Sequence, residues 1–209
     1  MSTRKSTSST ETRKGKGSLS RERILRAASD LFERSGYYGT GLNEIVRKGK
    51  APKGSIYYHF PGGKEQIASE AVLLVSRTLA EQSGRNLAEK RTAAEAVESF
   101  VDKLSSFIME SGYRTGGSLA IVASETAATS SELNKSCQEA YQVIRESISD
   151  KLQERGLPRS RAEALSTTIT AAVEGGIILS RTYHSRKPLQ TIAALLGDLV
   201  RAADPSNTT

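Results

Sequence analysis

The sequence predicts an all-α fold, with a small helical domain near the N-terminus and a larger helical domain after it. Apolar residues recur at three- and four-residue steps through nearly the whole chain, which is the period of an amphipathic helix. Glycine and proline interrupt these segments, whereas no segment keeps the strict alternation of a half-buried strand. An apolar run at 119–122 is short enough for a strand, but helix-forming residues follow it, so we predict a short helix there.

Three short helices are predicted between residues 20 and 60. The first carries one apolar face and ends at Gly36. Thr40 is a suitable N-cap for the second helix, which Gly49 ends after about two turns. Pro52 fits the first turn of the third, "PKGSIYYHF". Short helices joined by glycine-bearing turns are typical of a helix-turn-helix unit. The apolar residues of the first helix are Ile24, Leu25, Ala28, Leu31 and Phe32.

Charge divides the chain into a basic first part and a nearly neutral remainder. Residues 1–64 hold 14 Lys or Arg against five Asp or Glu, whereas residues 65–209 hold 16 against 18. This asymmetry indicates a polyanion-binding N-terminal domain. Residues 1–18 have no apolar residue after Met1, and we expect a disordered basic tail there. The predicted domains are then a helix-turn-helix domain at 19–66 and a helical ligand-binding and dimerisation domain at 67–204.

Composition argues against a secreted, membrane-bound or catalytic protein. A single cysteine, Cys137, cannot form an internal disulfide, and no apolar stretch reaches the roughly 20 residues of a membrane span. We therefore expect a cytoplasmic protein. Its two histidines, His59 and His184, stand 125 positions apart, and "GKAPKGS" lacks the lysine that a phosphate loop needs after its last glycine. We predict no catalytic residue, no metal site and no cofactor.

The third helix presents two different faces. At 100° per residue, Ile56 and Phe60 lie on one side and anchor the helix, whereas Gly54 and Tyr58 lie opposite. Tyr57 flanks the anchors. Hydroxyl and phenol groups bind phosphates and base edges, and a glycine lets backbone approach a partner closely, so this outer face fits the major groove of DNA. The alternative is that both tyrosines cover neighbouring helices.

Residues 24–72, "ILRAASDLFERSGYYGTGLNEIVRKGKAPKGSIYYHFPGGKEQIASEAV", resemble the DNA-binding domain of the TetR family of bacterial transcriptional regulators. The stretch from Ala51 onward is also similar to the branch of lincomycin- and flavonoid-responsive repressors of multidrug exporters. Two departures stand out. Ala51-Pro52 replaces a common Val-Ser, which removes a hydroxyl, and the "PGGK" link is one residue longer than the usual "PSK".

The resemblance implies a set of DNA-binding residues. Thr40 would cap the second helix and contact phosphate, and Lys64 would bind phosphate from the start of the fourth helix, where the dipole favours anions. The remaining positions would enter the major groove or contact the DNA backbone there. They are Lys53, Gly54, Ser55, Tyr57, Tyr58 and His59.

The resemblance further implies a homodimer on a pseudo-palindromic operator in double-stranded DNA, paired through the last two long helices. Residues 162–179 are rich in Ala, Thr and Gly, which permits close helix approach, and an apolar stripe follows in the last helix. An ordinary intrachain core is the alternative for both segments. The stripe comprises Leu189, Ile192, Leu195, Leu196 and Leu199.

A small-molecule effector is expected to bind among the helices between residues 95 and 184. The predicted function is a ligand-released repressor; the alternative is a DNA-tethered regulator that binds a protein partner and has no small-molecule effector. Candidate lining residues combine apolar bulk with a few polar groups. They are Phe100, Leu104, Phe107, Tyr113, Cys137, Tyr141, Ile144 and Tyr183.

Overall fold

The structure is a computed structural model that describes residues 8–90 and 92–203, and this part of the chain contains nine helices and no strand, which confirms the all-α prediction. The N-terminal helices are α1 (Ser8–Ser35), α2 (Leu42–Lys48), α3 (Lys53–His59) and α4 (Gly63–Glu89). The remaining helices are α5 (Ala93–Glu110), α6 (Ser118–Thr126), α7 (Ser131–Glu154), α8 (Arg159–Tyr183) and α9 (Lys187–Ala203).

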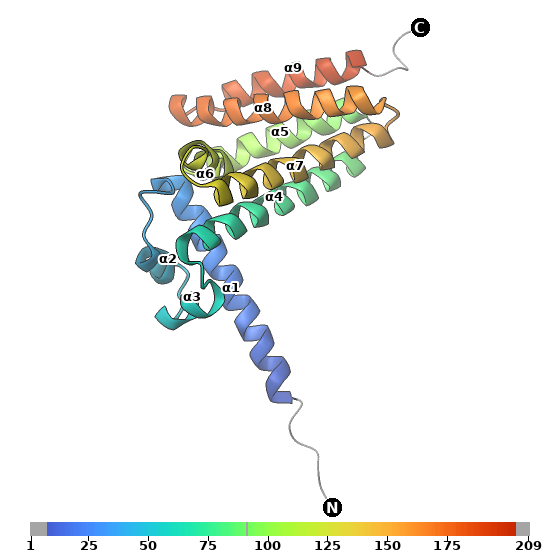
Figure 1. The fold of residues 1–209 in the computed structure, drawn as a ribbon. Coiled ribbons are helices and arrows are strands. Elements are labelled where there is room, and N and C mark those ends of the chain that lie inside the picture. The colour runs from blue at the N-terminus through green and yellow to red at the C-terminus, as the bar shows by residue number, and fades with distance from the viewer. Residues whose placement is uncertain (1–7, 91, 204–209) are drawn as a thin grey trace, which may run out of the picture.

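Figure 1 shows a helical body with a smaller unit beside it. The long helices α4, α5, α7, α8 and α9 form the body, in which α4 packs along α7 and α5 along α9. The short helices α2 and α3 lie beside α1, on the far side of the molecule from α9. Because α4 begins next to α3 and continues into the body, one uninterrupted helix joins the two parts, and the boundary predicted at 66/67 falls inside it.

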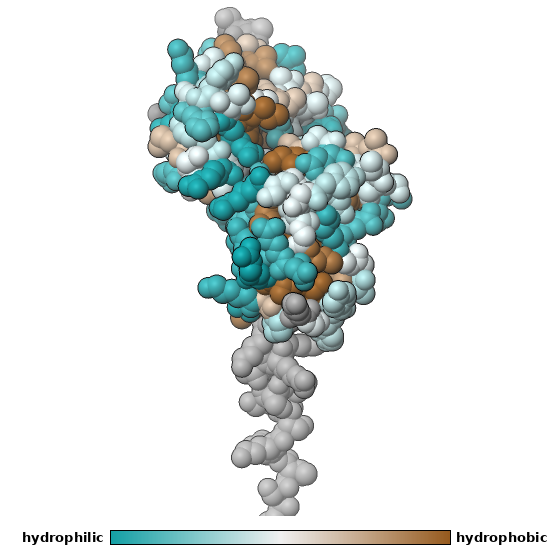
Figure 2. All heavy atoms as spheres, turned by 90° about the vertical axis from the view of Figure 1, so that its left-hand side faces the viewer, coloured by the Kyte–Doolittle hydropathy of each residue, from teal (hydrophilic) through white to brown (hydrophobic). Residues whose placement is uncertain are grey.

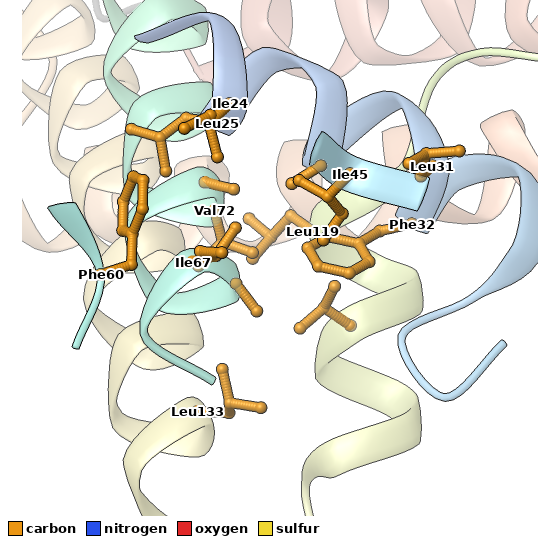
Figure 3. Packing of buried hydrophobic residues seen from close by; sticks show 14 of the residues in the cluster. Ile24, Leu25, Leu31, Phe32, Ile45, Phe60, Ile67, Val72, Leu119 and Leu133 are labelled. Carbon is orange, nitrogen blue, oxygen red and sulfur yellow. The ribbon is translucent and has the colours of Figure 1, made fainter. Parts of the chain in front are cut away.

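The N-terminal helices pack on an apolar core, the N-terminal core, which they share with α6 and α7 and which is drawn in Figure 3. Phe32 from α1, Ile45 from α2 and Phe60 at the end of α3 are almost completely buried. They pack with residues of α4 and with Leu119 of α6 and Leu133 of α7. Burying such side chains contributes about 1.5–3 kcal/mol each, which explains how helices of seven residues are held in place.

A second core fills the body between α5, α7, α8 and α9. Local signals set the helix starts: the Thr92 hydroxyl accepts from the Glu95 amide at 3.1 Å, and the Ser130 hydroxyl accepts from the Leu133 amide at 3.1 Å. Gly176 allows α8 and α9 to approach closely, since a Cβ there would lie 2.7 Å from side-chain carbons of α9. The small residues of α8 therefore serve packing within the chain as well as any outer contact.

One expectation about the helices was wrong. Helix α1 begins at Ser8 rather than near Ser20, so residues 8–18 of the predicted tail are helical, and only residues 1–7 lie outside the described residues. A helix already fixed by its packed turns extends into polar sequence at little cost, because each added residue gains one hydrogen bond. The α9 stripe divides: Leu189 and Leu196 are buried in the chain's own core, and Leu195 points outward.

Helix α8 is the one helix of the described ranges that is long and apolar enough to cross a membrane by length and composition alone. Its apolar residues lie on two faces. Leu165, Ile169 and Val173 pack into the body core, whereas Ile178 and Leu179 are exposed on the outside. The helix is therefore a core helix with an additional apolar outer surface.

Candidate nucleic-acid interface and internal cavity

The outer face of α3 carries two exposed tyrosines. Ile56 and Phe60 are buried in the N-terminal core, whereas 72% of Tyr57 and 82% of Tyr58 is exposed. A Cβ added at Gly54 would meet no atom within 4 Å, so the backbone there is open to a partner. The predicted orientation of the helix is confirmed, and the alternative that both tyrosines cover neighbouring helices is wrong. Their contact with DNA stays a prediction.

Three other predicted DNA contacts, His59, Lys53 and Ser55, also lie on α3. The His59 ring lies between its neighbours, with centroids 4.9 Å from Tyr58 and 6.3 Å from Phe60, and is partly buried. Lys53 and Ser55 belong to the first turn of α3, but their side chains lie outside the described part of the structure. Figure 2 shows that the side of the molecule carrying α2 and α3 is mostly hydrophilic, with small separate hydrophobic patches.

Thr40 has a different role from the predicted one. The N-cap of α2 is Gly41, which makes no side-chain cap. Thr40 is buried, and its hydroxyl donates to the Gly36 carbonyl at 2.7 Å. The hydroxyl therefore closes the α1–α2 loop, residues 36–41, and is not presented to a phosphate. The cap prediction failed because the chain turns one residue later than the sequence pattern suggests.

Lys64 is also engaged inside the protein. Its Nζ donates to the carbonyls of Tyr37 and Thr40 at 2.9 and 3.0 Å and lies 4.3 Å from the centre of the Tyr37 ring. Burial lowers the pKa of Lys64, and the nearby Glu125 carboxylate works in the opposite direction. Lys64 thus ties the start of α4 to the α1–α2 loop, which is a positioning role rather than a free cationic contact.

Helix α6 holds the α1–α2 loop from the other side. The Glu125 carboxylate accepts from the amides of Tyr37 and Tyr38 at 2.8 and 3.2 Å, and the Tyr38 hydroxyl bonds to Thr129 just beyond α6. Charge-assisted bonds of this kind are stronger than neutral ones. Glu125 stands 88 residues from Tyr37 and 87 from Tyr38 in the sequence, so no local sequence pattern predicts these bonds.

The first turn of α6 is joined to the last part of α1. The Ser29 hydroxyl donates to Ser118 at 3.1 Å, and the Glu33 carboxylate accepts from the Gly116 amide at 3.3 Å. Arg181 of α8 donates to the carbonyls of Gly116 and Glu33 at 3.0 and 3.1 Å. Gly116 and Gly117 have φ values of +94° and +105°, which suit glycine. Both ends of α6 therefore hold the N-terminal domain.

A cavity of about 850 Å³, partly open to solvent, lies between α1, the start of α6 and the helices of the body. Its volume is within the size range of small-molecule sites. Its walls come from α1, α4, α5, α7 and α8 and from the start of α6. Four of the predicted lining residues are present there: Phe100, Leu104, Phe107 and Ile144.

The other four predicted residues do not line the cavity, which corrects the prediction. Cys137 is buried in the N-terminal core, where burial raises the pKa of its thiol to about 11. Tyr113 stacks on His184 at 5.6 Å, and Tyr183 is exposed on α8. Tyr141 packs against the N-terminal core, and its hydroxyl donates to Glu174 at 3.2 Å.

Two walls of the cavity were missed by sequence reasoning. Helix α4 contributes Leu74, Val75, Thr78 and Leu79, and α1 contributes Ser29, Asp30 and Glu33. The apolar stripe of α4 was visible in the sequence, but the same stripe suits a helix packed against another helix. No sequence signal placed α1 beside a cavity.

Comparison with known proteins identifies the family to which this architecture belongs. Residues 24–71 match the family model "Bacterial regulatory proteins, tetR family", and residues 93–195 match "Transcriptional regulator LmrA/YxaF-like, C-terminal domain". The HTH-type transcriptional regulator LmrA of Bacillus subtilis is 40% identical over 87% of this chain and 97% of its own length. The uncharacterised HTH-type transcriptional regulator YxaF of the same organism is 38% identical over 87% of this chain and 95% of its own.

A solved structure supports the same placement. A TetR transcriptional regulator from Chloroflexus aurantiacus has a TM-score of 0.72 and 29% identity, covering 89% of this chain and 96% of its own. The class is thus a helix-turn-helix transcriptional regulator that binds DNA. Within that class, the chain belongs to the TetR family, with a C-terminal domain of the LmrA/YxaF-like type.

Proposed function

We propose that two copies of this chain form a cytoplasmic repressor that binds a pseudo-palindromic operator and leaves it when a small hydrophobic effector enters the cavity. The observation that carries the proposal is the position of α6. Its first turn lines the cavity, and its other end holds the loop that precedes α2 and α3. A ligand that changes the cavity therefore acts on an element already bonded to the α1–α2 loop, which leads into the proposed reading helices.

The outer surface of α8 and α9 supplies the dimer contact of the proposal. Ile178, Leu179 and Tyr183 on α8 and Leu195 on α9 are large apolar side chains exposed on these two helices. Burying them in a second copy would form a four-helix interface. Dimerisation would also make DNA recognition more specific, because one short helix contacts few base pairs, whereas two copies read both halves of a pseudo-palindrome.

In this account the reading surface is the outer face of α3. Tyr57 and Tyr58 supply phenol groups, Gly54 allows close approach, and His59 flanks them. The proposal keeps Lys53 and Ser55 as groove contacts from the family resemblance. Thr40 and Lys64 instead fix the loop that sets the angle of α2 and α3.

Release from DNA requires a ligand that binds the two arrangements of the dimer with different affinity. To reverse the populations from almost all DNA-bound to almost all free, the ligand's binding free energies for the two arrangements must differ by about 5.5 kcal/mol. A cavity walled by α1, α4 and α6 can supply it, because these helices are the links between body and reading helices.

The test is fluorescence anisotropy of the purified protein on labelled DNA from upstream of its own gene, with excess random DNA and a salt series. We expect binding that resists the competitor, two protomers per site, and an affinity that falls steeply with salt. Binding that random DNA removes, or an affinity unchanged by salt, would contradict the operator-binding proposal. Specific binding that no cavity ligand reverses would favour the protein-partner alternative.

A further inference from the structure

One carboxyl group of the cavity wall is left without a full set of partners. Glu174 of α8 lines the cavity, and its Oε1 accepts the Tyr141 hydroxyl at 3.2 Å. Its Oε2 is buried and has no hydrogen-bond partner among the described residues. A buried, unpaired carboxylate oxygen is costly, because the group has lost water and gained nothing in exchange. Such a group in a structural core would be expected to be replaced by an apolar side chain.

The other acidic groups of the wall already have partners. The Glu33 carboxylate accepts from the Gly116 amide at 3.3 Å, and Asp30 pairs with Lys48 at 3.2 Å. Glu174 has one neutral hydroxyl only, and burial raises its pKa although the bond from Tyr141 works in the opposite direction. Glu174 is therefore the acidic group of the wall that is available to a ligand.

The basic residues of the wall are at the surface. Arg26, Arg85 and Lys103 are exposed, and Arg26 pairs with Glu22 at 2.7 Å. The effects that set the pKa of Glu174 include no cation. A positively charged group on a ligand would therefore favour the ionised form of Glu174, which burial disfavours.

Apolar groups surround the rest of the space. Phe100, Leu104 and Phe107 face it from α5, and Ile169 and Val173 stand on α8 within five residues of Glu174. Aromatic and aliphatic walls with one charged group bind a ligand that has an apolar body and one cationic end.

We propose that Glu174 is the anchor of the effector site and selects hydrophobic ligands that carry a protonated amine. The inference rests on the proposed function, since it names the chemical class of the effector. The ammonium group donates to the free Oε2, while Tyr141 holds Oε1 and fixes the orientation of the carboxylate. The apolar body of the ligand lies against the walls from α4 and α5.

The test uses a matched pair of fluorescent probes. Dansylcadaverine carries a protonated primary amine, and its N-acetyl derivative has the same aromatic body without the charge. Binding of each is measured by anisotropy with the wild-type protein, with Glu174→Gln, and with Glu163→Gln as a control on the same helix, where Glu163 is exposed and pairs with Arg159. The control makes the same chemical change away from the cavity.

We expect the wild-type protein to bind the amine at least about tenfold more tightly than the acetylated probe. Glu174→Gln should abolish this preference by weakening the amine alone, whereas Glu163→Gln should keep it. Unchanged affinity for the acetylated probe shows that the variant is folded. Equal affinity for the two probes in the wild type, absence of amine binding, or equal losses for both in Glu174→Gln would overturn the inference.

The same probes separate this inference from the proposed function. If the amine binds through Glu174 but leaves the operator complex intact, the role of Glu174 in ligand binding is supported and the proposed release mechanism is contradicted. If the acetylated probe binds as tightly as the amine and releases DNA, the release mechanism is supported and the role of Glu174 in selecting an amine is contradicted.

Discussion

The N-terminal core and the cavity region of this molecule differ in how completely they are filled. In the N-terminal domain, Phe32, Ile45 and Phe60 are almost fully enclosed, as in a close-packed core. Between α1, the start of α6 and the body, a partly open cavity of about 850 Å³ remains, and Phe107 in its wall is 57% exposed. A filled core moves as a rigid unit, whereas a cavity can change shape when occupied. Under the proposed function, we expect a ligand to act on the open cavity and the helices α2 and α3 to move as one unit.

The largest expected effect comes from comparing truncation of a phenylalanine in the N-terminal core with truncation of one in the cavity wall. Phe60→Ala should lower the free energy of unfolding by about 3–5 kcal/mol, because Phe60 is fully buried and leaves a cavity. Phe107→Ala should cost about 1 kcal/mol or less, since its ring already faces open space. Urea unfolding measures both. Similar losses for the two variants would refute the contrast between a filled and an open core.

The second prediction concerns the outer surface of the body. Leu195→Glu should convert the dimer to monomer and weaken operator binding by about tenfold or more, because a charge replaces an apolar interface contact. Leu19→Glu is the control for oligomeric state, since both leucines are 62% exposed and Leu19 lies on α1. Sedimentation velocity distinguishes them. A dimer that survives Leu195→Glu would place the interface elsewhere.

The third prediction addresses the reading helix. Tyr58→Ala should weaken specific operator binding by about 1–3 kcal/mol and leave the stability of the protein nearly unchanged, because Tyr58 is exposed. Non-specific binding should change less. Anisotropy with operator and random DNA provides the comparison. Equal losses on both DNAs would assign Tyr58 to phosphate contact instead.

The link between the two regions gives a smaller effect. Glu125→Ala removes the acceptor of the Tyr37 and Tyr38 amides and should reduce ligand-induced release of DNA, while ligand affinity for the free protein stays the same. The expected loss of coupling is about 1 kcal/mol. Titrating the operator complex with a cavity ligand measures it. Release as efficient as in the wild type would mean that α6 is not the connection.

The smallest effect is a dependence of stability on pH. Burial raises the pKa of Glu174, so the folded state binds its proton more tightly and loses stability as pH rises through the folded pKa. Glu174→Gln lacks this loss. The variant should therefore be more stable than the wild type near about pH 7, with the difference narrowing toward about pH 4. Thermal unfolding at several pH values tests this; a difference that widens in acid would reverse the assignment.

Sequence periodicity predicted the reading helix well because its two faces are a local property. Ile56 and Phe60 turn inward and Tyr58 outward, as the 100° step requires. The bonds of Lys64 and Thr40 to the α1–α2 loop were not predicted, because the positions of loop carbonyls cannot be deduced from a sequence pattern.

The residues that line the cavity were harder to predict from the sequence than the two faces of α3. Phe100, Leu104 and Phe107 of α5 do line the cavity. Cys137 and Tyr183 were also assigned to it, although Cys137 lies in the N-terminal core and Tyr183 is exposed. Periodicity shows that a face is apolar, and it does not show whether that face meets a helix, a cavity or a second copy. The bond between Tyr141 and Glu174 likewise joins residues 33 positions apart.

The most direct test of the connection between cavity and reading helices is the affinity of one cavity ligand for the protein with and without its operator. Coupling between two sites is reciprocal, so a ligand that weakens DNA binding must itself bind more weakly to the DNA complex, by the same factor. We predict a decrease of about tenfold or more for dansylcadaverine on the operator-bound dimer. Equal affinity for free and DNA-bound protein would show that the cavity does not control the reading helices.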